Sequence, residues 1–309
     1  MNKKIIVLSI FILLLPGMLV LIAGKRNEKG TYENLYTGEY RVVMGDTEFD
    51  MERYIIMVLA AYLPPETEPE CLKAMSIVIR TTILKAMNWE HRIDANILPL
   101  EYLSYKEMAD KWGEDNFVKY YRTFEEAVGE TSGYVIMDRN ADYIDALFHR
   151  ISIGHTRDGS LLGEEYTYLK KKESAKDIES GEFQQITTYS DETVIDLLDD
   201  GSGQLKEQYA MSGLPLSYVM DVEKTDGYVE NINMYGISIR AELFCKRLGL
   251  NSPSFVFEEY KGQTRFIVKG VGHGYGISIY GANELAKEGY KYKDIINYYY
   301  SDVIIKYIS

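Results

Sequence analysis

Histidine, tyrosine and serine alternate with glycine in residues 270–282, and this run holds the side chains best placed to do chemistry. Glycine at every second position leaves the backbone bare, so a ligand or another strand can come close. No glycine follows three residues after Gly272 or Gly274, which excludes the dinucleotide-binding fingerprint. His273 is therefore a candidate site residue, and a packed turn or bulge is the structural alternative.

A second group of polar residues surrounds His149 and His155, which lie six residues apart. Two imidazoles at this spacing could bind zinc if Asp158 or His273 supplied a third ligand, but no cysteine lies nearby to strengthen such a site. Histidines that face solvent or contact an organic ligand are the simpler interpretation. Three of the four histidines fall in the two glycine-bearing motifs, so we expect one shared cleft. The residues expected to meet there are His149, Ser152, Thr156, His273 and Ser278.

The elements that would position these residues predict an α+β domain with antiparallel strands. Residues 51–63 show helical spacing up to Pro64, and Thr67 with Glu70 resembles a capping box for a second helix. Strands are predicted at 134–137 and 144–151, and paired strands within 216–240. Further helices are predicted at 124–133, 241–248, 282–288 and 293–300.

The composition is typical of a globular protein, and the net negative charge disfavours binding to polyanions. It has 309 residues, 46% of them hydrophobic and 26% charged, and a formal net charge of −13. Nucleic acids and polybasic membrane contacts both require positive clusters, so neither is expected. Cys71 and Cys245 are far apart in the sequence. A disulfide between them is conceivable in an exported protein, but two buried helical cysteines are the preferred interpretation.

The N-terminus predicts a membrane anchor over residues 1–26. An uncharged apolar run at 5–23 lies between lysines on one side and Lys25 with Arg26 on the other. Its length is close to that of a membrane-spanning helix. A cut after Ala23 would place the large side chain of Leu21 where signal-peptide cleavage sites have a small residue, so this is a poor cleavage site. An uncleaved anchor is therefore preferred to a signal peptide. We expect a single-pass protein of the cell membrane with a tether at 27–48 and one extracytoplasmic domain at 49–309.

Three motifs resemble the stage II sporulation protein D family (SpoIID/LytB-like). The run GVGHGYGISIYGA is similar to the family's GWGHGVGMSQYGA, with Val271 for Trp and Ile279 for Gln. MERYIIMVLAAYLPPETEPECLKAMSIVIRTTIL resembles its opening helices, including the Arg80-Thr81 pair. IDALFHRISIGHT resembles its strand that reaches H-S-T-S-G-G-x-T. The motifs occur in the family's order over residues 49–309, and some members carry zinc on the central loop.

The resemblance implies a lytic transglycosylase that cleaves the glycan strands of peptidoglycan with one glutamate as general acid and then base. Tyr62 stands at the position of that glutamate. A phenol is a weak proton donor near neutral pH, so cleavage is expected to be weak or lost. Glu66 could supply a relocated acid, although Glu66 and Glu68 at the start of a helix also have a structural explanation.

The chain is therefore predicted to bind glycan strands in the cell wall, in sporulation or wall turnover, as a pseudoenzyme or weak enzyme. Tyr275 and Tyr280 are the preferred aromatic contacts for sugar rings because they lie beside His273. Arg80 is predicted either to contact glycan or to pair with a buried carboxylate. The expected partners are the glycan strands, the membrane through the N-terminal helix, and other cell-wall proteins. No cofactor is expected unless His149 and His155 bind zinc.

Overall fold

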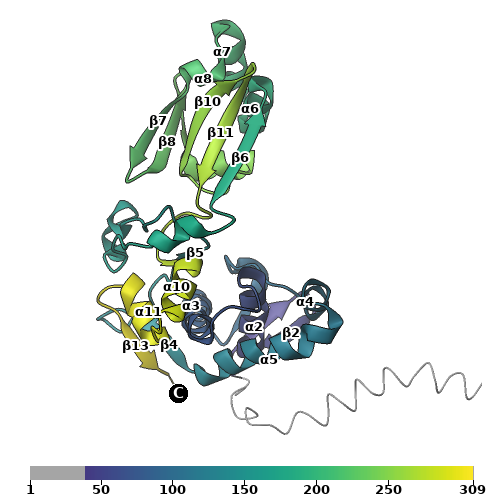
Figure 1. Cartoon of the computed structure of the whole chain (residues 1–309), viewed down its shortest axis with the longest axis vertical. Helices are drawn as coiled ribbons and strands as arrows, with labels where there is room; N and C mark the ends of the chain where they lie inside the picture. The colour runs from purple at the N-terminus through teal and green to yellow at the C-terminus, as the bar shows by residue number, and fades with distance from the viewer. Residues whose placement is uncertain (1–38, 309) are drawn as a thin grey trace, which may run out of the picture.

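The computed structural model describes residues 39–308, which pack around two separate hydrophobic cores (Figure 1). The larger core draws on residues before 170 and after 274, whereas the smaller core lies entirely between Val194 and Val268. We call residues 39–182 and 271–308 the first lobe, and residues 183–270 the second lobe. The prediction of one domain over 49–309 did not anticipate the second core.

Helix α3 (Pro69–Met87) runs through the centre of the first lobe and carries a long buried stripe. Helix α2 (Met51–Tyr62) begins where the Asp50 side chain accepts a hydrogen bond from the Glu52 backbone, and it packs against α3. The remaining first-lobe helices are α4 (Tyr105–Trp112), α5 (Glu114–Glu130), α10 (Ile279–Lys287) and α11 (Tyr292–Tyr299), with 3-10 turns η1 (Ala95–Ile97), η2 (Gly159–Leu161), η3 (Glu164–Tyr166) and η4 (Ala175–Glu179).

The predicted capping box at the start of α3 is wrong. Glu68 is the N-cap residue and Pro69 begins the helix, because proline lacks the N–H that the first turn leaves unpaired. The Thr67 hydroxyl instead donates to the Pro64 carbonyl at 2.6 Å. Glu70 accepts from the Tyr292 backbone at 3.0 Å and so ties α3 to α11.

Short strands complete the first lobe. β1 (Arg41–Met44) lies between β2 (Thr47–Asp50) and β3 (Arg92–Asp94), so folded structure begins inside the predicted tether. β4 (Tyr134–Met137) pairs with β13 (Ile304–Tyr307) near the C-terminus. The strand predicted at 144–151 is reduced to β5 (Phe148–His149), which pairs in parallel with β12 (Ile277–Ser278).

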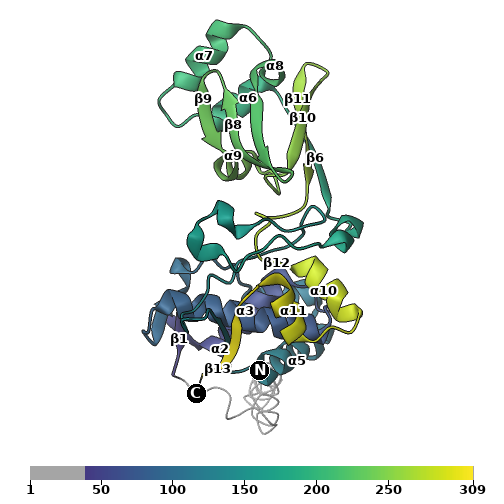
Figure 2. The same ribbon diagram turned by 90° about the vertical axis from the view of Figure 1, so that its left-hand side faces the viewer.

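Two antiparallel sheets and four helices form the second lobe, which the chain enters through β6 and leaves through β11 (Figure 2). In its core Phe244 stacks on Phe255, and Phe266 meets both rings edge-on. The first sheet is β10–β11–β6, with β6 (Gln184–Tyr189), β10 (Phe255–Tyr260) and β11 (Gln263–Lys269); the second is β7 (Asp221–Thr225), β8 (Tyr228–Met234) and β9 (Ile237–Arg240). The helices are α6 (Asp191–Leu198), α7 (Gln204–Ser212), α8 (Leu216–Val219) and α9 (Ala241–Leu248).

Mixed helices and antiparallel strands agree with the predicted α+β class. Helix α9 ends at Gly249, as predicted, with a left-handed φ of 63°. Cys71 and Cys245 are buried and free, one in each core, as the helical interpretation predicted. No helix within residues 39–308 is both long and apolar enough to cross a membrane. The predicted anchor at 1–26 lies outside the described residues.

Candidate functional site

The pairing of β5 with β12 joins the two glycine-bearing motifs of the sequence. Ser278 lies opposite His149 in this pairing, although the residues are far apart in the chain. Gly272 has a φ of +103°, and a Cβ there would lie 2.8 Å from the Cβ of His149. A Cβ at Gly276 would collide with the Leu147 carbonyl oxygen. The glycines are therefore needed for close backbone approach, which was the structural interpretation of the run.

His149 and His273 come from these two motifs, and their ring centroids lie 5.9 Å apart. The prediction that these two histidines lie close together is confirmed. The Nδ1 of His149 lies 3.0 Å from the Tyr275 carbonyl oxygen, which can only accept, so Nδ1 carries the proton. In His273 the Nδ1 instead accepts from the Tyr275 backbone N–H at 3.1 Å. The Nε2 of His149 is consequently a lone-pair acceptor, buried and without a partner among residues 39–308.

Both histidines are held neutral at physiological pH. Burial, followed by the neighbouring His273, lowers the pKa of His149 to about 3. Burial, followed by the Arg157 guanidinium, lowers the pKa of His273 to about 4. Two neutral rings can donate or accept hydrogen bonds but cannot attract an anion by charge.

A cleft of about 930 Å³ opens at these histidines. The end of α2 and one face of α3 form one wall, β5 and the glycine run form another, and Asn251 reaches in from the second lobe. The cleft is lined by Ala61, Tyr62, Thr82, Lys85, Ala86, Pro99, Leu100, Glu101, Asp145, Ala146, Leu147, Phe148, His149, Arg150, Asn251, Val271, Gly272 and His273.

Tyr62 lies in this cleft, where its ring meets the Phe148 ring edge-on at 5.0 Å between centroids. Its hydroxyl oxygen accepts a hydrogen bond from the Glu101 backbone N–H at 3.0 Å. Burial raises the pKa of Tyr62, so the phenol is an even weaker acid than usual. The hydroxyl proton has no acceptor among the described residues and can be donated to a ligand.

The carboxylates of the cleft are Glu101 and Asp145, and the predicted substitute Glu66 is not among them. Glu66 is exposed and accepts a hydrogen bond from the Tyr120 hydroxyl at 3.3 Å. Asp145 forms an ion pair with Lys85 at 2.8 Å across the cleft. Glu101 makes no ion pair within residues 39–308, so it is the cleft carboxylate whose charge is not already compensated.

The serine and threonine residues of the predicted site have internal roles. Asp177 is fully buried and accepts from the Ser278 hydroxyl and from the Ser152 backbone, both at 2.6 Å. Ser278 also caps helix α10. The Thr156 hydroxyl accepts from the Lys172 backbone at 2.9 Å. These side chains are close to the histidines in the fold, but they are buried behind the cleft and do not line it.

Arg80 is a structural residue and not a cleft residue. Its guanidinium is fully buried and forms two hydrogen bonds with the Glu52 carboxylate, at 2.6 and 2.7 Å. It also donates to backbone carbonyls of α5 and of the turn after it. The alternative that Arg80 pairs with a buried carboxylate is confirmed, and no donor is left for a glycan.

The two tyrosines preferred as sugar contacts differ in position. Tyr275 is buried, with its ring 4.3 Å from the Arg157 guanidinium, and burial raises its pKa to about 12. Tyr280 is half-buried at the start of α10, where its backbone N–H donates to the Arg150 carbonyl at 3.0 Å. Neither residue lines the main cleft.

His155 does not join His149 in a metal site. Its ring packs edge-on to Tyr228 at 6.2 Å, and its Nδ1 lies 3.3 Å from the Thr156 carbonyl oxygen. Across residues 39–308 no three side chains from histidine, cysteine, aspartate and glutamate are grouped to hold an ion.

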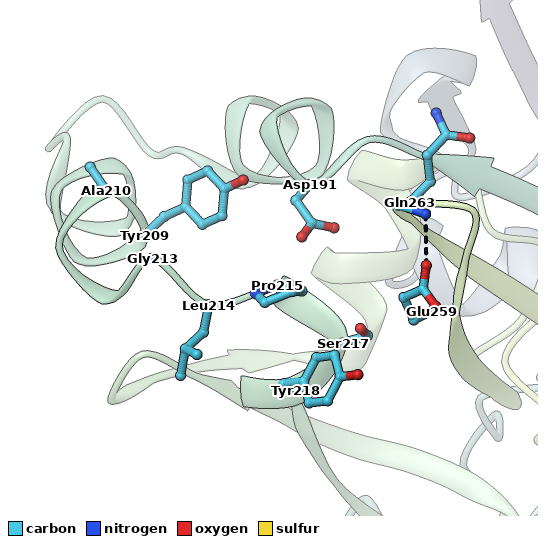
Figure 3. Close-up of a pocket in the computed structure, with 11 residues that line it drawn as sticks. Asp191, Tyr209, Ala210, Gly213, Leu214, Pro215, Ser217, Tyr218, Glu259 and Gln263 are labelled. Carbon is cyan, nitrogen blue, oxygen red and sulfur yellow. Dashed lines mark hydrogen bonds between the residues drawn. The ribbon is translucent and has the colours of Figure 1, made fainter.

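A separate pocket of about 530 Å³ lies at the far end of the second lobe (Figure 3). Asp191, Tyr209 and Tyr218 surround it. The carboxylate of Asp191 accepts from the Leu216 backbone at 2.7 Å and from the Thr264 hydroxyl at 2.8 Å. The Tyr209 hydroxyl donates to Glu192 at 3.0 Å. These polar groups hold the lobe together. We call this hollow the tip pocket.

Sequence reasoning missed several residues of the cleft. Thr82 and Lys85 are three residues apart on α3, so helical spacing from the predicted buried stripe could have found them. Glu101 lies in a loop and reaches Tyr62 only through the tertiary fold. Asn251 follows α9 of the second lobe, and no local pattern marks it.

Comparisons with known proteins agree with the motifs. The family model described as stage II sporulation protein matches residues 41–137. The chain is 29% identical to stage II sporulation protein D of Bacillus amyloliquefaciens over 265 residues, covering 82% of this chain and 74% of the relative. It is 28% identical to stage II sporulation protein D of Bacillus subtilis over 259 residues, covering 81% and 72%. The chain is therefore similar to stage II sporulation protein D over most of its length, and the region matched by the family model includes the helices that form one wall of the cleft.

Proposed function

We propose that this protein binds peptidoglycan glycan strands in the cleft, and that it cleaves them weakly or not at all. The observation that carries the proposal is Tyr62, which occupies the position expected for a catalytic glutamate and lies inside the cleft. Its raised pKa leaves a hydroxyl that can hold a sugar oxygen but cannot readily protonate it.

The polar groups of the cleft suit a neutral, hydroxyl-rich polymer. Tyr62 offers a donor and the Nε2 of His149 offers an acceptor, while the one cleft lysine is paired with Asp145. Such a mixture of donors, acceptors and aromatic edges is typical of sites that bind sugars. The names of the relatives support a role in sporulation. Anchoring of the chain through residues 1–26, with both lobes outside the cytoplasm, is part of the same proposal.

Obstruction of the cleft tests binding directly. Ala86 is exposed on α3 at the cleft wall, and Ala210 is exposed on α7 at the tip pocket. In co-sedimentation of the full-length protein with purified glycan strands, Ala86→Trp should reduce the bound fraction at least tenfold, on the order of 1.4 kcal/mol. Ala210→Trp should bind like the native protein. Equal binding by both variants would refute the cleft as the glycan site.

A second candidate function is cleavage of the glycan strand, and it is favoured by the position of Glu101 in the cleft. A protonated carboxyl would give its proton to the glycosidic oxygen as the bond to the anomeric carbon breaks. The resulting carboxylate would take the proton of the muramoyl C6 hydroxyl as that oxygen closes on the anomeric carbon. Glu101 adjoins Tyr62 and has no ion pair among residues 39–308, whereas Glu66 faces away from the cleft. Loss of cleavage in Glu101→Gln, with full activity in Glu66→Gln, would establish this alternative.

A further inference from the structure

A second hollow of about 420 Å³ adjoins the cleft, and it is lined mainly by apolar side chains. Leu147 and His273 line both spaces, so the cleft and the second hollow meet along these two residues. The other lining residues are Leu162, Arg240, Glu242, Leu243 and Tyr275. We call this space the apolar annex.

The walls of the apolar annex come from both lobes. Leu162 belongs to the first lobe and is 40% exposed, and Leu243 belongs to α9 of the second lobe and is 44% exposed. Two leucines lining one hollow would lose water contact if a ligand filled it. Arg240 and Glu242 form an ion pair of 3.7 Å at the same place and supply polar groups for hydroxyls or amides.

The two walls are held in position beside His273. The Nη2 of Arg157 in the first lobe donates to both carboxylate oxygens of Glu230 on β8, at 2.5 and 2.6 Å. The guanidinium also lies 5.0 and 4.3 Å from the ring centroids of Tyr228 and Tyr275. Charge-assisted hydrogen bonds and cation–π contacts together hold this arginine in place. The apolar annex is therefore formed before any ligand arrives.

We infer that the apolar annex is a second subsite for the same glycan strand, so that the second lobe makes the protein prefer long strands over short fragments. The inference rests on the proposed function. A polymer lying in the cleft can continue past His273 into the annex through the residues that the two spaces share. The apolar face of the next sugar, or its acetamido methyl group, would pack against Leu162 and Leu243, with polar groups toward Arg240 and Glu242.

Chain-length dependence of binding tests this inference. We would measure the affinity of the full-length protein for peptide-free disaccharide and tetrasaccharide fragments by isothermal titration calorimetry. The native protein should bind the tetrasaccharide at least tenfold more tightly. Leu243→Ala should reduce this advantage roughly fivefold and leave disaccharide binding unchanged, because only the longer ligand reaches the annex. Leu162→Ala should have the same effect from the opposite wall.

Leu197→Ala is the matched control, since Leu197 is 40% exposed on α6 of the second lobe and lines neither space. It should keep the native ratio. Binding of both fragments with equal affinity, or an unchanged ratio in Leu243→Ala, would overturn the subsite while the proposed function survives. Binding of neither fragment would overturn both. An effect of Leu243→Ala confined to fragments that carry stem peptides would assign the annex to peptide and refute the inference.

Discussion

The cleft of the first lobe and the tip pocket of the second differ in how their polar groups are used. In the cleft, three polar groups have no partner within residues 39–308: the Tyr62 hydroxyl proton, the Nε2 of His149 and the Glu101 carboxylate. In the tip pocket, Asp191 and Tyr209 are bonded to their own lobe. Unused hydrogen-bonding capacity inside a hollow indicates where a ligand is expected, and cavity size alone does not.

The largest expected effect comes from restoring a carboxyl at the cleft. Tyr62→Glu should raise the rate of glycan cleavage by up to about 10²–10⁴-fold, because a positioned general acid typically supplies that much. The measurement is the rate of anhydromuramic end formation. Tyr218→Glu places the same change at the tip pocket, where Tyr218 is exposed, and should leave the rate at the native level. Equal rates in the two variants would remove the distinction between the two hollows.

Loss of the ion pair that joins the two lobes should reduce both the free energy of unfolding and the affinity for glycan. Arg157→Met leaves Glu230 without its partner and removes the cation–π contacts of the guanidinium with Tyr228 and Tyr275. We expect a loss of roughly 2–3 kcal/mol in the free energy of unfolding, below the 3–5 kcal/mol of a fully buried pair because Glu230 is partly exposed. Urea unfolding measures it. Arg139→Met removes an exposed ion pair with Asp302 and should change stability by less than about 1 kcal/mol.

Acidification should weaken the fold through the neutral histidines of the cleft. The pKa of His149 is lowered to about 3 in the folded protein, so the unfolded chain binds its proton more readily below pH 6.5. Stability is therefore fully present above pH 6.5 and is lost as the pH falls toward 3. Between pH 7 and pH 5 the loss due to His149 alone should be up to about 2 kcal/mol. His149→Gln should therefore lose less stability than the native protein over the same pH range.

The sequence predicted α2, α3 and the helices after residue 240, together with the close approach of the two motifs, but it missed α4, α6, α7 and α8. Periodicity identified the region of α2 and α3 because their buried stripes are long. Glycine spacing predicted the close approach that brings His149 to His273. The second core was missed because only the local pairing within 216–240 was predicted, whereas β6 pairs with β11 much further along the chain. Ser152 and Ser278 were taken for ligand contacts because their bond to Asp177 spans distant segments.

The smallest expected effect isolates one hydrogen bond in the cleft. Tyr62→Phe removes the donor but keeps the ring against Phe148, so glycan affinity should fall about two- to tenfold. Tyr218→Phe at the tip pocket should leave affinity unchanged. Calorimetric titration with the tetrasaccharide distinguishes the two. A larger loss of affinity in Tyr218→Phe than in Tyr62→Phe would place the glycan in the tip pocket and contradict binding in the cleft.

Mass spectrometry of glycan strands after incubation with the native full-length protein tests the central claim most directly. If Tyr62 has replaced the acid in a cleft that still holds glycan, the strands should be bound but carry few anhydromuramic ends. Abundant anhydromuramic products from the native protein, lost in Glu101→Gln and unaffected by Tyr62→Phe, would contradict the account and show that the cleft has kept its acid at another position.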